Sequence, residues 1–169
     1  IVGGDLSTTE GADSVVDEAT RVLGGLDILI NNAGGTSAAL LMRMRDEDWD
    51  DVIRINLRSA IACSRRAVSG MLRQRDGRII NISSVAGTTG GATQLAYSAG
   101  KAAVVGITKT LAKEWGRYNV TVNCVAFGYI GTRLTASFSD KPGSISVNAR
   151  QHTVGLSESQ IAAAKEAPA

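Results

Sequence analysis

The sequence has very few of the residues that build metal sites and disulfide frameworks. Its 169 residues include one histidine, His152, which belongs to no Cys/His cluster, so we expect no metal site. The two cysteines, Cys63 and Cys124, lie in apolar stretches that resemble regular secondary structure. We interpret both as reduced core residues of a cytoplasmic protein rather than as a disulfide pair.

Long apolar runs and a strong excess of one charge are missing as well. No run approaches the roughly 18 apolar residues that a membrane-spanning helix needs, so we expect no membrane partner. The 18 basic and 16 acidic residues leave a formal net charge of +2, which gives no reason to expect nucleic acid as a partner. With 44% hydrophobic residues, the composition is that of a single folded domain over residues 1–169.

What the sequence does contain is an alternation of strand-like and helix-like segments. Short apolar runs have strand character at residues 26–30, 78–83 and 120–126, and residues 1–5 resemble the end of a further strand. Apolar residues at helical spacing predict helices over residues 10–24, 47–74 and 94–117. This order predicts an α/β fold, a doubly wound, Rossmann-like parallel sheet with helices on both faces.

Ligands of such sheets bind beyond the carboxyl ends of the strands. Polar or glycine-rich residues follow each predicted strand, at Asp5-Leu6, Asn31–Gly35, Ser83-Ser84 and Phe127–Thr132. Residues 133–160 are rich in serine, glycine and polar residues. For them the sequence leaves two readings open, a substrate-side loop or lid, and a long surface loop without function.

Tyr97 and Lys101 stand four residues apart and so share one face of the helix predicted over residues 94–117. A free tyrosine titrates near 10, and a nearby ammonium lowers that pKa by favouring the phenolate. The pair could also be structural, a tyrosine beside a lysine that reaches to solvent. Ser84 favours a catalytic reading, because it ends a predicted strand 13 residues before Tyr97 and could donate to a substrate carbonyl oxygen. The alternative is that a serine there caps the next segment.

Four blocks of the sequence resemble the short-chain dehydrogenase/reductase family in order and spacing. They are N-N-A-G at 31–34, I-N-L around Asn56, N-I-S-S-V-A-G at 81–87 and Y-S-A-G-K at 97–101. The resemblance runs from about Asp5 to Thr132. Within the family, the stretch LLMRMRDEDWDDVIRINL is most similar to the 3-oxoacyl-[acyl-carrier-protein] reductases.

The resemblance implies a role for each matching residue. Tyr97 would be the proton donor in reduction, Lys101 would lower its pKa and hold the nicotinamide ribose, and Ser84 would orient the substrate carbonyl. Asn56 would hold a water that links Lys101 to a proton relay. The remaining implied cofactor contacts are Asp5 and Leu6 at the adenine, Asn32, Ala33 and Gly34 near the ribose, and Ile130 and Thr132 at the nicotinamide.

Two departures from the family pattern stand out. Phe127-Gly128 replaces the usual Pro-Gly after the last predicted strand. In addition, neither G-x-G-x-x-G nor G-x-x-x-x-G-K-[ST] occurs, so the family's glycine-rich phosphate loop is not in this sequence. We therefore expect an incomplete sheet that lacks the first βαβ unit, before Ile1, and the last strand, after Ala169.

The implied function is an NAD(P)-dependent carbonyl/alcohol oxidoreductase that reduces a 3-oxoacyl thioester, free or carrier-bound, as in fatty acid biosynthesis. The resemblance favours NADP, with NAD possible, and a homo-oligomer that pairs through helices 47–74 and 94–117. The alternative is a non-catalytic fragment of such an enzyme that acts only by association or does not fold alone. A serine hydrolase is excluded, because Ser84 lacks a G-x-S-x-G turn and the sole histidine lies in the weakly patterned tail.

Overall fold

A parallel three-stranded sheet organises the protein, as a computed structural model shows for residues 1–131, 143–147, 150–154 and 161–162. The strands lie in the order β1-β2-β3, with bounds β1 Ile28–Asn31, β2 Gly77–Ser84 and β3 Val120–Phe127. Both pairings are parallel, and Asn31 is in register with Asn81, which pairs in turn with Cys124. The predicted Rossmann-like α/β class is confirmed.

Helices connect these strands. The three long ones are α1 (Thr9–Leu23), α3 (Ser59–Gln74) and α5 (Leu95–Trp115). The shorter elements are η1 (Leu41–Arg43), α2 (Asp46–Ile53), the π-helical turn η2 (Arg54–Arg58), α4 (Ala86–Thr89) and η3 (Gly116–Tyr118). Because α2, η2 and α3 follow one another without a break, the single helix predicted over residues 47–74 exists, but it contains a π turn.

Local chemistry accounts for the ends of α1. The Thr8 hydroxyl accepts a hydrogen bond from the Gly11 amide at 3.0 Å and so caps the first turn. Gly24 ends the helix in the left-handed region, with a φ of 75°, where a residue without a Cβ costs least. The predicted helix over residues 10–24 is therefore displaced by only one residue.

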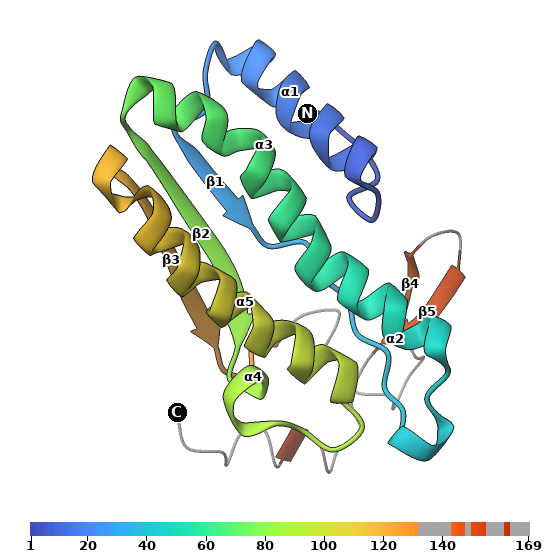
Figure 1. Cartoon of the computed structure of the whole chain (residues 1–169). Coiled ribbons are helices and arrows are strands. Elements are labelled where there is room, and N and C mark those ends of the chain that lie inside the picture. Colours follow the sequence, from blue (N-terminus) through green and yellow to red (C-terminus); the bar gives the residue numbers. More distant parts are fainter. Residues whose placement is uncertain (132–142, 148–149, 155–160, 163–169) are drawn as a thin grey trace.

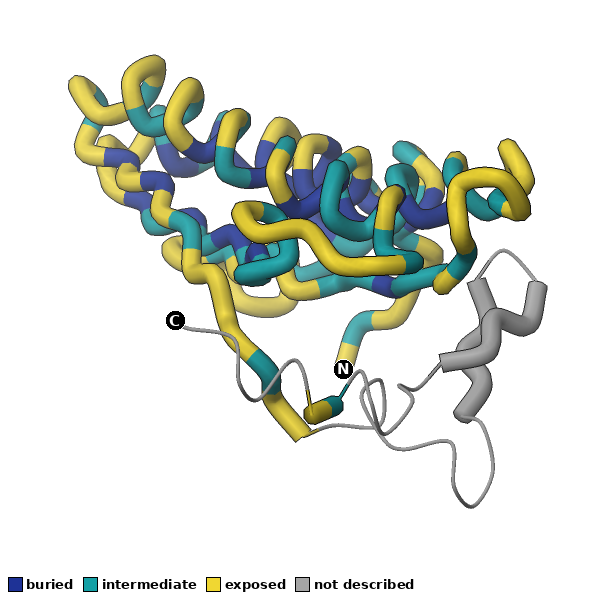
Figure 2. The backbone as a smooth tube through the Cα atoms, turned by 90° about the horizontal axis from the view of Figure 1, so that it is seen from below, coloured by how far each residue is buried: buried dark blue, intermediate teal, exposed yellow. Residues whose placement is uncertain are grey.

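All three long helices lie on one side of the sheet, as the two perpendicular views show (Figures 1 and 2). Helices α3 and α5 pack on the strands, and α1 packs on α3. Alternate strand residues, among them Ile79 and Val122, join Met71 and Val16 in the buried core between the sheet and the helices. The expected cover on both faces is thus not found among the described residues.

The other face of the sheet is apolar and open. Ile28, Ile30, Val125 and Phe127 are all exposed on it, and the exposed fraction reaches 57% at Ile30. These side chains alternate with the core-facing ones, as the register of a half-covered sheet requires. The run of apolar residues in each strand is therefore explained by two apolar faces, of which the described helices cover one.

Three further sequence expectations concern the ends of the chain. Residues 1–5 form no strand, contrary to the prediction. Most of the predicted loop or lid over residues 133–160 lies outside the described residues, but strands β4 (Gly143–Val147) and β5 (Arg150–Val154) form an antiparallel pair there that the sequence did not predict. None of the described helices is both long and apolar enough to cross a membrane.

Candidate active site

The candidate site lies at the carboxyl ends of the three parallel strands. β1 runs into the loop that begins at Asn32, β2 ends at Ser84 and β3 ends at Phe127. A hydrogen bond from the Val85 amide to the Phe127 carbonyl oxygen, at 3.0 Å, joins the ends of β2 and β3. The first turns of α5 carry Tyr97 and Lys101 to this edge, which is where a parallel sheet binds ligands (Figure 1).

Tyr97 is partly buried and forms a hydrogen bond with Ser84, so the structure brings these two predicted residues together. Burial raises the pKa of the Tyr97 phenol above its usual value, and the hydrogen bond with Ser84 opposes that rise. The Ser84 oxygen also accepts a hydrogen bond from the Ala86 amide at 3.2 Å, which fixes its position at the end of β2.

Lys101 is 5% exposed, which is rare for a lysine. Its Nζ donates to the carbonyl oxygen of Ile82 at 2.8 Å and lies 5.6 Å from the centre of the Tyr97 ring. Burial lowers the pKa of Lys101, while the nearby Cys124 thiol acts in the opposite sense. The predicted tuning of the phenol by the ammonium remains a prediction.

Asn56 reaches the site from the π turn η2, a wider turn of the kind that often occurs at functional sites. Its Nδ2 donates to the Gly35 carbonyl oxygen at 2.7 Å and to the Val52 carbonyl oxygen at 2.8 Å. Its Oδ1 is buried and accepts no hydrogen bond from the residues that the structure describes. A Cβ on Gly34 would lie 2.7 Å from that oxygen and 3.6 Å from Lys101 Nζ, so these three residues enclose one small polar space.

The other predicted cofactor contacts are more dispersed. Asn32 is exposed and Ala33 partly buried in the loop before Gly34. The carboxylate of Asp5 accepts a hydrogen bond from the Ser7 amide at 2.9 Å, and its hydrogen bonds with Ser7 lower its pKa. Leu6 packs against the hydrophobic core. Ile130 is exposed beyond β3, and Thr132 lies outside the described residues.

Sequence reasoning missed a buried polar chain under the site. Asn31 Nδ2 donates to Ser64 Oγ at 2.9 Å and to Asn81 Oδ1 at 2.8 Å, and Asn81 Nδ2 donates to Thr108 Oγ1 at 2.9 Å. This chain of hydrogen bonds thus links β1 and β2 to both α3 and α5. The only sequence signal was two asparagines within otherwise apolar strands.

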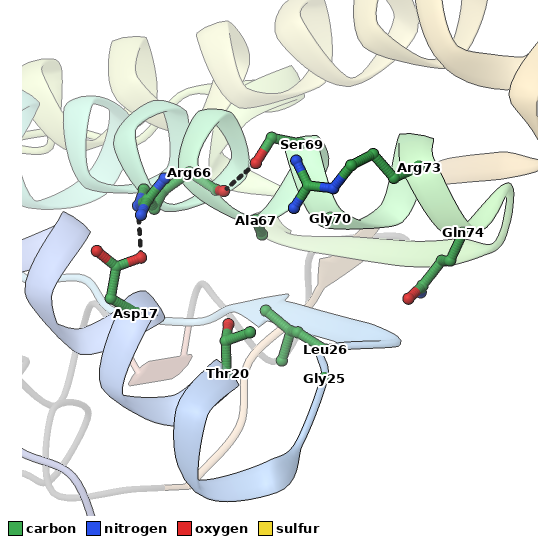
Figure 3. A pocket seen from close by; sticks show the side chains of 10 residues that line it. All are labelled: Asp17, Thr20, Gly25, Leu26, Arg66, Ala67, Ser69, Gly70, Arg73 and Gln74. Atoms are coloured by element: carbon green, nitrogen blue, oxygen red, sulfur yellow. Dashed lines mark hydrogen bonds and ion pairs between the residues drawn. The ribbon is translucent and has the colours of Figure 1, made fainter.

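A surface pocket of about 330 Å³ lies elsewhere, between α1 and α3 (Figure 3). Asp17 and Arg66 form an ion pair of 2.5 Å across it, and Thr20, Gly25 and Arg73 are among its other lining residues. Gly25 precedes β1, so the pocket lies toward the amino ends of the strands, away from Tyr97. Its lining contains none of the predicted site residues.

Comparisons with known proteins identify the family of the chain. The family described as short chain dehydrogenase matches residues 1–143. The 3-oxoacyl-[acyl-carrier-protein] reductase FabG of Vibrio cholerae is 44% identical over 137 residues, which are 81% of this chain and 56% of that protein. The FabG of Thermotoga maritima is 46% identical over 127 residues, 75% of this chain and 52% of that protein.

A relative with a different name shows the same degree of similarity. Nodulation protein G of a Rhizobium species is 44% identical over 137 residues, again 81% of this chain and 56% of that protein. The chain therefore spans about half the length of the curated relatives it matches. Since the family match covers most of its residues, the chain belongs to the short-chain dehydrogenase family.

Proposed function

We propose that the protein is an NAD(P)-dependent oxidoreductase that reduces a 3-oxoacyl thioester to the 3-hydroxyacyl form. The observation that carries this proposal is the placement of Tyr97, hydrogen-bonded to Ser84 and above a buried Lys101, at the carboxyl ends of parallel strands. The substrate class rests on the relatives that are named 3-oxoacyl-[acyl-carrier-protein] reductases.

The residues around Lys101 fit a dinucleotide cofactor. Gly34 leaves space where any side chain would collide with Asn56, and the buried Asn56 Oδ1 offers an acceptor to a water or a hydroxyl. We propose that Asn32, Ala33, Gly34 and Lys101 hold the ribose end of NADP, with NAD as the alternative, and that Asp5, Leu6, Ile130 and Thr132 complete the cofactor contacts. When bound, this cofactor supplies the hydride.

In the proposed reaction, the protein supplies the proton. A tyrosine is protonated at neutral pH even with its ordinary pKa near 10, and burial raises the pKa of Tyr97 further, so the phenol has a proton to donate to a carbonyl oxygen. Ser84 lies beside the phenol, so its hydroxyl can orient that carbonyl and afterwards donate to the phenolate that remains.

Lys101 limits the cost of forming the phenolate. Keeping the phenolate at neutral pH requires a pKa shift of about three units, or roughly 4 kcal/mol. A buried ammonium is screened less by water than an exposed one and can provide part of this energy. We propose that Asn56 holds the water through which Tyr97 and Lys101 are then reprotonated.

The proposed partners are an acyl substrate, carrier-bound or small, and further copies of the chain that pair through α3 and α5. The cytoplasm is the proposed location, and Cys63 and Cys124 are both free thiols. A second candidate function is association without catalysis by this chain. The open apolar face of the sheet at Ile30 and Val125 favours that candidate.

The test is an assay of the 169-residue chain with NADPH and a 3-oxoacyl thioester, after circular dichroism has shown a folded protein. We expect Tyr97→Phe to lower turnover by at least about 100-fold, because the phenyl ring keeps the packing but has no proton to donate. Tyr118→Phe is the matched control, since Tyr118 stacks on Arg117 at the far end of α5.

Three results would separate the candidates. Turnover that survives Tyr97→Phe would remove Tyr97 from the mechanism. Saturable NADPH binding by a chain without turnover would place the cofactor site here but reject catalysis by this chain alone. A folded chain that neither binds NADPH nor turns over substrate would leave association as the supported function.

A further inference from the structure

Strand β2 contacts both the backbone and the side-chain ammonium of Lys101. The Ser83 hydroxyl donates to the backbone carbonyl oxygen of Lys101 at 2.8 Å. The Lys101 Nζ donates to the carbonyl oxygen of Ile82, also at 2.8 Å. The next residue of the strand, Ser84, forms the hydrogen bond with Tyr97. Three consecutive residues of β2 therefore contact the lysine backbone, the lysine ammonium and the tyrosine phenol.

A close approach by Gly87 fixes the same turn of α5 from another side. A Cβ on Gly87 would lie 2.8 Å from the Lys101 carbonyl carbon and 2.9 Å from the Ala102 nitrogen, so only glycine allows this packing. Gly87 belongs to α4, which packs along α5. The backbone of Lys101 is thus held between the end of β2 and α4.

Ser83 occupies a position where packing alone would favour an apolar residue. It is 3% exposed and lies on the core-facing row of β2, which it shares with Ile79. Two other buried hydroxyls, those of Ser59 and Thr108, donate to a carbonyl oxygen one helical turn earlier, at Ile55 and Val104. The Ser83 hydroxyl instead joins a strand to a helix, at the residue that carries the buried ammonium.

We propose that Ser83 is a positioning residue for the reaction: by holding the Lys101 backbone against β2, it sets the place of the ammonium relative to Tyr97 and Gly34. This inference rests on the proposed roles of Tyr97 and Lys101. Catalytic groups are sensitive to such placement, since a displacement of about 1 Å can cost about 100-fold in rate.

The experiment compares three variants of the full chain. Ser83→Ala removes the hydroxyl, and Ser83→Thr keeps it. Ser59→Ala is the matched control, because Ser59 is similarly buried, at 4% exposure, and its hydroxyl donates to the Ile55 carbonyl oxygen in the adjoining turn η2 rather than to Lys101. Each variant is measured for urea unfolding, for steady-state kinetics and for the titration of the Lys101 side chain by NMR on isotope-labelled lysine. The Lys101 signal is assigned with Lys101→Met.

We expect Ser83→Ala and Ser59→Ala to lower the urea midpoint by similar amounts, because each loses one buried hydroxyl. Only Ser83→Ala should reduce kcat, by about 10- to 100-fold, with KM for the acyl thioester changed by less than about twofold. The same variant should move the pKa of Lys101 back toward its ordinary value, since a loosened helix admits water. Ser83→Thr should restore both properties.

A Ser83→Ala variant that matches Ser59→Ala in kcat and in the Lys101 titration would overturn the proposal and leave Ser83 a structural residue. A wild-type chain without turnover would count against the proposed function, and the Lys101 titration would then decide on Ser83 by itself. If Ser83→Ala does not fold, Ser83→Cys keeps the volume with a weaker donor. An unchanged Lys101 titration in that variant would equally contradict the proposal.

Discussion

At the scale of single residues, the space beside Lys101 depends on Gly34. A methyl group there would lie 2.7 Å from the buried Asn56 Oδ1, closer than atoms that are not hydrogen-bonded can approach. We expect Gly34→Ala to destabilise the fold by about 1 to 3 kcal/mol through overpacking and to weaken NADPH binding. Urea unfolding and a fluorescence titration with NADPH measure the two effects.

Gly106→Ala is the control for that substitution. Gly106 lies within α5, and outside the neighbouring helix backbone no atom of the described residues is within 4 Å of the Cβ it would gain. Alanine there should stabilise the protein by about 1 kcal/mol, because glycine is a poor helix former. Equal effects of the two substitutions would contradict the close contact at Gly34.

The pKa of Tyr97 gives a second prediction at this scale. Because burial raises that pKa above 10.0, the folded protein keeps a proton that the unfolded chain has lost above this pH. The stability that this provides is complete below pH 10.0 and disappears as the pH rises through the folded value. Lys101 acts in the opposite sense. Burial lowers its pKa from 10.5, so burying the ammonium costs free energy of folding at low pH, and this cost disappears as the pH rises from the lowered value to 10.5.

Tyr97→Phe isolates the contribution of the phenol to the pH dependence of the free energy of unfolding. Between about pH 9 and about pH 11, wild type should lose more unfolding free energy than Tyr97→Phe, as measured by urea unfolding at a series of pH values. Identical pH profiles would mean that the Tyr97 phenol ionises as freely in the folded protein as in the unfolded chain.

At the scale of elements, the buried polar chain that contains Asn31 and Asn81 links two strands to two helices by hydrogen bonds. Asn81 is fully buried and bonds with both Asn31 and Thr108. We expect Asn81→Ala to lower the free energy of unfolding by about 2 to 3 kcal/mol, because it leaves buried polar groups without a partner. Urea unfolding measures this loss.

Asn123→Ala supplies the matched control, since Asn123 lies in β3 on the open face of the sheet and is exposed. Its effect should stay within about 0.5 kcal/mol. If both substitutions lower the free energy of unfolding equally, the loss comes from a change in strand propensity rather than from the buried hydrogen bonds of Asn81.

The elements themselves were largely predictable, because apolar periodicity records which side of a helix or strand is covered. Residues 94–117 were predicted as a helix and contain α5, and residues 78–83 fall within β2. Periodicity cannot show one additional residue within a turn, so the π turn that carries Asn56 was not predicted. It also cannot tell which partner a buried hydroxyl selects, and the contact of Ser83 with Lys101 appeared only in three dimensions.

At the scale of the whole molecule, the two faces of the sheet differ. The helix-covered face holds the core and the buried asparagine chain, and the open face exposes Ile30 and Val125. The sequence predicted cover on both faces because strands alternate with helices, an order that is typical of doubly wound parallel sheets. Alternation alone does not tell on which face each connecting helix packs, and the three long described helices all lie on the same one.

This exposure leads to a prediction for the chain as a whole. A face with exposed Ile28, Ile30, Val125 and Phe127 should bind the dye ANS, which fluoresces on accessible apolar surface. The double substitution Ile30→Thr with Val125→Thr should reduce that fluorescence. It should change the free energy of unfolding by less than about 1 kcal/mol, because both side chains are already 40% or more exposed and threonine keeps strand propensity.

Thr121→Val, at an exposed position of β3 on the same face, should raise the fluorescence instead. Dye binding that none of these substitutions alters would place the accessible apolar surface elsewhere, with the exposed Leu41 and Met42 as the next positions to test.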